Sequence, residues 1–384
     1  MGLKEVYLDN GATTKIDPRV LKAMTPYLTG RYGNASSTHM FGQDSKNALE
    51  MARKTIAKSI NANPEGMIFT SGGTESNNLA IKGIAFANRD KGNHIITTKV
   101  EHKSVLNICK WLEKQAFEVT YLDVDSEGFV DPKGLENAIT KKTILVSIIH
   151  GNNEIGTIQD LEALGNVCKR EKVYFHTDAC QSYTKTGVDV KKQNIDLITL
   201  NSHKIHGPKG VGTLYVGKGV EITPWQHGGG QESGMRGGTE NIPGVIGFAE
   251  AARLALDKKH VEHMTKLRDR LIKGVLEIPG VKFNGPEGGK RLCNNADFSF
   301  KGIEGEALGG YLDQKRISSS TGSACAARTL EPSHVLKAIG LTNEEANGSL
   351  RLTLSRFNTE EEIDYVLEVL PKLVEKLRRI SPFT

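Results

Sequence analysis

Short apolar runs alternate with amphipathic stretches between about residues 66 and 216. The runs are rich in β-branched and aromatic residues, which is typical of buried strands, and they span residues 66–70, 95–98, 117–122, 144–149, 173–177, 197–200 and 212–216. The stretches between them repeat apolar residues at helical spacing, most clearly at 104–114, 132–140 and 160–170. Strands that alternate with helices in this way predict an α/β fold, with a mostly parallel sheet between helices.

The pattern changes after a glycine-rich segment at residues 228–238. A longer helical region follows from about residue 243 to 276, and strand-like runs then recur at 281–283, 296–300 and 350–354. Thr359 and Glu362 have the spacing of a capping box, which predicts the start of a final helix. We therefore expect a large α/β domain at residues 14–257 and a smaller α+β domain formed by residues 1–13 and 258–384.

Composition and charge exclude several classes of protein. The formal net charge of the 384 residues is only +5, so we expect no direct nucleic-acid partner. The sequence begins without a signal-peptide pattern and contains no apolar run of membrane-spanning length. The five cysteines are widely spaced and form no C-x-x-C pair, so neither a disulfide framework nor a metal site is indicated. We expect a reduced, cytoplasmic protein without a metal.

Two charged residues follow predicted strands at the same edge of the sheet. Lys204 comes after the run 197–200 and before the turn at Gly207 and Pro208. It is either a solvated lysine, as most are, or a partly desolvated amine whose lowered pKa lets it form a Schiff base. Asp178 ends the run 173–177, where its carboxylate could keep a pyridine nitrogen protonated or could cap a helix.

Two other strand ends carry candidate cofactor contacts. Gly73 and Thr74 lie in a glycine turn that leads from a strand into a helix, and the first amides of such a helix can hold a phosphate. An ordinary capped helix has a similar sequence. His102 follows another strand, where its ring could stack on a flat cofactor or be purely structural.

Cys325 differs from the other cysteines in its surroundings. Every residue from 318 to 327 is small, which is typical of an accessible loop, and Arg328 is close enough in sequence to favour a thiolate. Free cysteines are mostly inert core residues, and this is the interpretation of Cys109, Cys168 and Cys293. Cys325 is therefore the candidate nucleophile.

Taken together and in this order, these motifs resemble those of the cysteine desulfurase family, within the class V aminotransferase-like, fold-type I pyridoxal-phosphate enzymes. The resemblance runs from residues 7–14 to 356–364, and the Gly-Ser-Ala-Cys segment that ends at Cys325 resembles the iron–sulfur-cluster and nitrogen-fixation type. It implies pyridoxal 5'-phosphate as cofactor and L-cysteine as substrate. The products would be L-alanine and a persulfide on Cys325.

The resemblance also implies roles for the residues around the cofactor ring. Lys204 would carry the cofactor and later move the α-proton of the substrate. Asp178 would pair with the pyridinium nitrogen, Gln181 with the phenolic oxygen, and His102 would stack on the ring. Catalysis would thus rest on Lys204, Cys325 and His102.

The remaining implied roles concern the phosphate and the substrate carboxylate. The phosphate would be held by residues near two strand ends, namely Gly73, Thr74, Ser202 and His203. Thr239 would reach the phosphate from a partner subunit, which implies a homodimer. Asn153 and Arg351 would bind cofactor and substrate, because a guanidinium can grip a carboxylate with two parallel hydrogen bonds. Asn201 departs from the family pattern, since a hydroxyl residue often contacts the phosphate at that position.

Several alternatives stay open at this stage. A selenocysteine lyase or another class V aminotransferase-type enzyme would need Lys204 and Asp178 but not Cys325. A sulfur carrier or scaffold-binding protein with a vestigial cofactor site would not need the intact Lys204, Asp178 and Gln181. The resemblance implies a sulfur acceptor or iron–sulfur scaffold protein as partner, and the persulfide would serve cluster assembly or tRNA thiolation equally well. The tail by which many cluster-assembly members dock a scaffold is not expected after Thr384.

Overall fold

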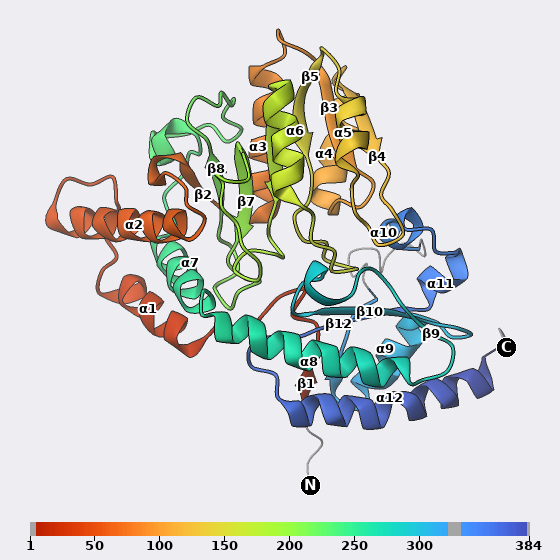
Figure 1. Ribbon diagram of the computed structural model, residues 1–384. Helices are drawn as coiled ribbons and strands as arrows, with labels where there is room; N and C mark the ends of the chain where they lie inside the picture. The colour runs from red at the N-terminus through yellow and green to blue at the C-terminus, as the bar shows by residue number, and fades with distance from the viewer. Residues whose placement is uncertain (1–4, 322–331, 382–384) are drawn as a thin grey trace.

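The computed structural model describes residues 5–321 and 332–381. The predictions for Cys325 and Arg328 therefore lie outside the described residues. Within those residues the chain forms two groups of elements, an upper group around a large sheet and a lower group around α8 and α12 (Figure 1). No described helix combines the length and the apolar character that crossing a membrane requires.

The largest sheet within the described residues has seven strands in the order β2-β8-β7-β6-β5-β3-β4. Their bounds are β2 Met67–Thr70, β8 Gly212–Val216, β7 Leu197–Asn201, β6 Tyr174–Asp178, β5 Thr143–Ser147, β3 His94–Thr98 and β4 Glu118–Leu122. Strand β8 runs antiparallel to both of its neighbours, and the other neighbouring pairs are parallel. The mostly parallel sheet is thus confirmed. Strands β3, β5 and β7 are buried along their whole length, as is typical of parallel strands with helices on both faces.

Helices cover both faces of this sheet. One face packs against a core that includes side chains of α2 (Met40–Ser59), α6 (Leu161–Glu171) and α7 (Ile242–Ala255). The other face packs against α3 (Gly73–Ala87) and α4 (Lys103–Glu113). Figure 1 shows α6 in front of the sheet and α3 and α4 behind it. Two further helices complete this group, α1 (Pro18–Thr29) and α5 (Pro132–Ala138).

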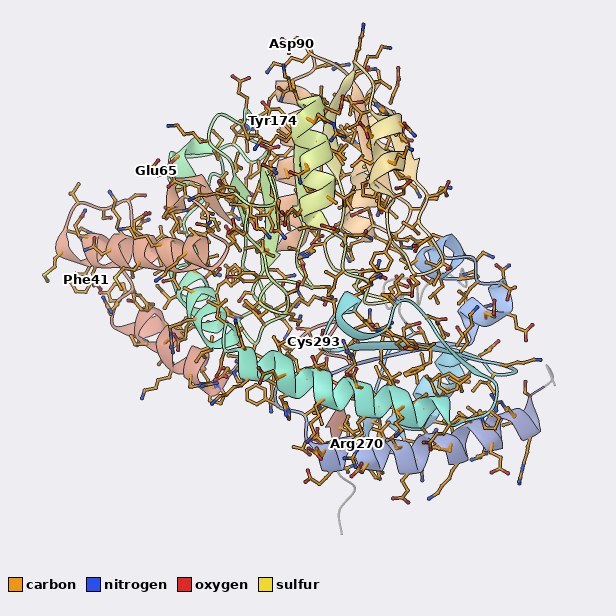
Figure 2. All side chains as sticks on the ribbon, in the orientation of Figure 1. Phe41, Glu65, Asp90, Tyr174, Arg270 and Cys293 are labelled. Carbon is orange, nitrogen blue, oxygen red and sulfur yellow. The ribbon has the colours of Figure 1, made fainter. Side chains whose placement is uncertain are left out.

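The lower group of elements has its own hydrophobic core. A three-stranded antiparallel sheet, β9 (Val281–Phe283), β10 (Asn295–Phe300) and β12 (Ser349–Thr353), is packed by α8, α9 and α12. The three helices span α8 Lys258–Leu276, α9 Gly305–Asp313 and α12 Glu360–Ile380. The remaining elements of this group are short, namely the strands β1 Val6–Tyr7 and β11 Ile317–Ser318 and the helices α10 His334–Ala338 and α11 Asn343–Asn347. Arg270 joins α8 to α12 through ion pairs with Glu360 and Asp364 (Figure 2). Helix α12 begins at the capping box of Thr359 and Glu362, as the sequence predicts.

The predicted helical region between residues 243 and 276 consists of two helices, α7 and α8. The helical conformation is interrupted between them at Asp257. The carboxylate of Asp257 accepts a hydrogen bond from the backbone N–H of Lys259 and so caps α8. Val6 and Leu8 pack into the same core as residues of α8 and α12. A domain boundary near residue 257, with residues 1–13 in the smaller domain, stays a prediction that these two observations support.

Candidate active site

A cavity of about 300 Å³ lies where the parallel strands of the large sheet end. Its walls come from the segments at or after the ends of β2, β3, β5, β6 and β7, together with residues 11–12, the start of α10 and β12. Ligands of open α/β sheets bind at this edge, outside the carboxyl ends of the strands. The cavity brings together nine of the sequence-predicted site residues, namely Gly73, Thr74, His102, Asn153, Asp178, Gln181, His203, Lys204 and Arg351.

Lys204 lies at the floor of this cavity, three residues beyond the end of β7. Its Nζ donates hydrogen bonds to the carbonyl oxygens of Gly11 and Ala12. Burial, and secondarily the charge of Arg351, lower the pKa of Lys204 to about 8. A noticeable share of the amine is therefore neutral near pH 7, and a neutral amine is the form that attacks carbonyl groups. The desolvated lysine predicted from the sequence is the alternative that the structure supports.

Asp178 is tied to His102 through two side chains that the sequence did not single out. Asn77 donates one hydrogen bond to Asp178 Oδ2 at 2.7 Å and another to Ser104 Oγ at 2.8 Å. Ser104 Oγ in turn lies 2.8 Å from His102 Nδ1. Asp178 Oδ1 accepts from the backbone of Cys180, so the carboxylate is held at both oxygens. It terminates β6 and does not cap a described helix.

The partners of His102 fix the tautomer of its ring. The backbone N–H of Ser104 donates to Nδ1 at 3.1 Å, so Nδ1 carries no proton and His102 caps α4. Burial lowers the pKa of His102, which favours the neutral ring. The proton of that neutral ring is therefore on Nε2, and Nε2–H is the donor left for the cavity.

The start of α3 forms one wall of the cavity. The helix cap is Gly72, and no described side chain satisfies the first amides of α3. A Cβ at Gly73 would lie 2.6 Å from Cys180 Sγ, so the backbone approach requires glycine. Thr74, Asn201 and His203 line the same cavity. This is a cradle of hydrogen-bond donors at the positive end of a helix dipole, which suits a phosphate group.

Arg351 reaches the cavity from the small sheet. Its neighbours Leu350 and Leu352 on β12 point into the lower core, so the alternation of strand side chains turns Arg351 toward the other face. Its Nη1 donates to the carbonyl of Asn153 at 2.8 Å, and Nη2 pairs with Asp9 at 3.1 Å. The guanidinium is only 3% exposed, and these partners orient it rigidly.

Two sequence-predicted residues that the structure describes do not line this cavity. Ser202 is fully buried, and its Oγ has no hydrogen-bond partner among the described residues. Thr239 is exposed on the surface of the chain. Gln181 does line the cavity, and its Nε2 donates to Gly11, the same carbonyl that Lys204 contacts. The individual roles assigned to these residues stay predictions.

Replacing Asn77 with alanine tests the network between Asp178 and His102. We expect turnover to fall about tenfold, because the buried Asp178 carboxylate and Ser104 each lose a hydrogen bond. Steady-state assays with L-cysteine and candidate amino-acid substrates would measure the change. The matched control is Asn78→Ala on the same helix, whose side chain only donates to the backbone of Thr74. Equal effects of both changes would contradict the network.

Comparison with known proteins places the chain among related sequences. The Aminotransferase class-V family matches residues 6–366. A protein named "Cysteine desulfurase IscS" from Clostridium botulinum is 52% identical over 383 residues, which cover 99% of this chain and 96% of the relative. A protein of the same name from Methanosarcina thermophila is 53% identical, with 99% and 95% covered.

Solved structures of related proteins have the same fold as this chain. A structure described as a NifS-like protein superposes with a TM-score of 0.92 at 38% identity, covering 97% of this chain and all of that one. A structure of SspA in complex with cysteine superposes with a TM-score of 0.82 at 37% identity, covering 93% of this chain and all of that one.

Proposed function

The chain belongs to the aminotransferase class-V family as a cysteine desulfurase, and we propose that it carries pyridoxal 5'-phosphate on Lys204 and moves the sulfur of L-cysteine to Cys325. One observation carries the proposal. A desolvated lysine of lowered pKa, a fixed carboxylate and a buried guanidinium line a single cavity at the carboxyl edge of the sheet.

The donor set of the cavity fits this cofactor. The first amides of α3, with Thr74 and His203, would hold the phosphate. The hydroxyl of Ser202 has no hydrogen-bond partner among the described residues and would be a further donor. Asp178 would keep the pyridine nitrogen protonated, Gln181 would contact the phenolic oxygen, and His102 would cover the ring. When bound, pyridoxal phosphate acts as an electron sink for charge that develops on the substrate α-carbon.

Different residues would bind the substrate L-cysteine and transfer its α-proton. Arg351 would bind the carboxylate with Asn153 beside it, because Asp9 and the Asn153 carbonyl already hold the guanidinium in place. The Lys204 amine, once displaced by the substrate amine, would take the α-proton and return it to the product. Its lowered pKa suits that task near neutral pH.

The other cysteines are poor candidates for the sulfur-accepting thiolate. Burial raises the pKa of Cys109 and Cys168 to about 12 and that of Cys293 to about 11, and it raises the pKa of Cys180 well above its ordinary value. Figure 2 shows Cys293 in the interior between the two groups of elements. A thiol that resists ionisation is a weak nucleophile. The resistance of these thiols to ionisation supports Cys325, whose neighbours in the sequence are all small.

We also propose that the protein is a homodimer with shared active sites. Thr239 does not line the cavity of its own chain and is exposed, as expected of a residue that contacts the phosphate of a partner. Arg236 pairs with Glu75 in the first turn of α3 and holds the segment before Thr239.

Mixed dimers test this arrangement. Co-expression of Thr239→Ala subunits with Lys204→Ala subunits should give more activity than either variant alone, since one site in each mixed dimer combines an intact Lys204 with an intact partner Thr239. Random pairing limits the recovered activity to roughly one quarter of the wild type. Differently tagged subunits allow the mixed dimers to be purified and assayed. A fully active monomer in sedimentation would contradict the shared site.

The persulfide requires an acceptor, and we propose that this is a sulfur-acceptor or iron–sulfur scaffold protein. The sulfur would then serve either iron–sulfur cluster assembly or tRNA thiolation. The four described cysteines are free thiols, which agrees with a cytoplasmic location.

Product analysis tests the function itself. Incubation with L-cysteine and a reductant should release alanine and sulfide in equal amounts and consume no keto acid. A class V aminotransferase would instead need a keto acid, and a selenocysteine lyase would act on selenocysteine and leave cysteine unchanged. Either result would overturn the proposed function.

A further inference from the structure

His334 is a second imidazole at the cavity, and it lies outside the sequence-predicted site. It begins the short helix α10 and is the first cavity-lining residue after the undescribed segment 322–331. The preceding Ser333 is buried and donates a hydrogen bond to the carboxylate of Glu154, which also lines the cavity. This bond fixes the start of α10 against the cavity wall.

A second contact fixes the ring of His334. Its Nε2 lies 2.9 Å from the backbone carbonyl oxygen of Glu101. That carbonyl belongs to a rigid segment, because the buried Glu101 side chain accepts hydrogen bonds from Thr98 Oγ1 at 2.9 Å and from the Ile149 amide at 2.7 Å. The imidazole therefore has a well-defined position.

The partner of Nε2 decides the tautomer. A carbonyl oxygen can only accept, so Nε2 must carry the proton. In the neutral ring, Nδ1 of His334 is then an acceptor that remains for a ligand. His102 has the opposite arrangement, because its Nδ1 is occupied by Ser104 and its Nε2–H is left as a donor. The two imidazoles thus offer one donor and one acceptor to the same cavity.

The carboxylates of the cavity are already engaged. Asp178 accepts from Asn77 and from the Cys180 backbone, and Glu154 accepts from Ser333. The amide oxygen of Asn201 has no partner among the described residues, but Asn201 lies beside Gly73, at the end of the cavity suited to phosphate. His334 Nδ1 is therefore an acceptor that the cavity offers to a weak donor on the substrate.

We propose that His334 binds the thiol of the substrate, with Nδ1 accepting the S–H hydrogen of L-cysteine. This inference rests on the proposed function, in which Arg351 takes the carboxylate of the substrate and the substrate amine displaces Lys204. A thiol is a weak donor, and a neutral imidazole nitrogen in a partly desolvated site is an acceptor that can use it. His334 thus selects a substrate with a thiol over L-alanine, which is the product without one.

Equilibrium binding tests the proposal without turnover. In the Cys325→Ser holoenzyme, dissociation constants for L-cysteine and L-alanine are measured from changes in visible absorption. His334→Gln should lower the preference for L-cysteine over L-alanine about tenfold, because the glutamine amide can still donate to the Glu101 carbonyl but leaves no acceptor at the Nδ1 position. The affinity for L-alanine should not change.

His334→Asn is the matched variant. Its amide oxygen can take the place of Nδ1, so it should keep more of the preference for L-cysteine than His334→Gln does. Equal weakening of both ligands in His334→Gln would show a purely structural role and overturn the proposal, and so would an unchanged preference. Failure of the wild-type enzyme to form alanine from L-cysteine would instead overturn the proposed function.

Discussion

Replacing Lys204 with alanine is expected to abolish the release of alanine from L-cysteine while the protein stays folded. The lysine would supply both the covalent attachment of the cofactor and the proton transfer at the substrate α-carbon. Among the described residues, Lys103 is the other lysine that lines the cavity, and it follows a different strand. Loss of a covalent catalyst costs about a thousandfold or more in turnover. Alanine release per minute and the far-ultraviolet circular dichroism spectrum are the measurements.

Lys209→Ala provides the matched control for this change. Lys209 lies in the same loop after β7 but is exposed and does not line the cavity. It should keep wild-type turnover and the yellow colour of the cofactor-loaded enzyme, whereas Lys204→Ala should lose the cofactor on extensive dialysis. Turnover of Lys204→Ala within about tenfold of the wild type would rule out the assignment.

Replacing Cys325 with serine should stop the reaction at a later step. The cofactor contacts come from segments remote in sequence from residue 325, so the variant should bind pyridoxal phosphate with unchanged affinity and should still bind L-cysteine. It should release almost no alanine, because none of the four described thiols ionises readily enough to accept the sulfur. Absorption spectra follow the binding, and amino-acid analysis follows the alanine.

Ser323→Ala is the control for the Cys325 change, since it alters the same small-residue segment and removes no thiol. It should keep most of the activity. Normal alanine release by Cys325→Ser would exclude the persulfide mechanism and favour a lyase that eliminates sulfur directly.

The strands of the large sheet were predictable from short runs of apolar and β-branched residues, most of which are buried, although the edge strand β4 is only partly buried. Each run of apolar residues appears in the structure with ends displaced by at most two residues, as for 144–149 against β5 at Thr143–Ser147. The order of the strands and the reversal of β8 depend on long-range pairing, which periodicity along the sequence does not contain. The helices α1 and α2 were not predicted.

The cavity was predictable where its residues directly follow a strand. Gly73, His102, Asp178 and Lys204 all meet at one edge because the carboxyl ends of parallel strands lie together. The supporting side chains could not be found in this way. Asn77 lies inside a helix, and its contacts with Asp178 and Ser104 bridge residues far apart in the sequence.

The contacts between the two groups of elements could not be predicted from the sequence either. Lys204 meets the carbonyls of residues 11–12 near the start of the chain, and Arg351 meets Asp9 across more than three hundred residues. His334 had a signal that could have been used, since Ser333 has the residue type of a helix cap. Its place at the cavity follows only from the fold.

Transfer of sulfur to Cys325 is the central claim, and peptide mass spectrometry tests it most directly. The holoenzyme is mixed with one equivalent of L-cysteine without reductant, the protein is digested, and alanine is quantified in the same sample. The peptide that contains Cys325 should gain the mass of one sulfur atom for each alanine released, and reductant should remove it. Alanine formed without added sulfur on that peptide, or sulfur found on Cys180 instead, would contradict the account.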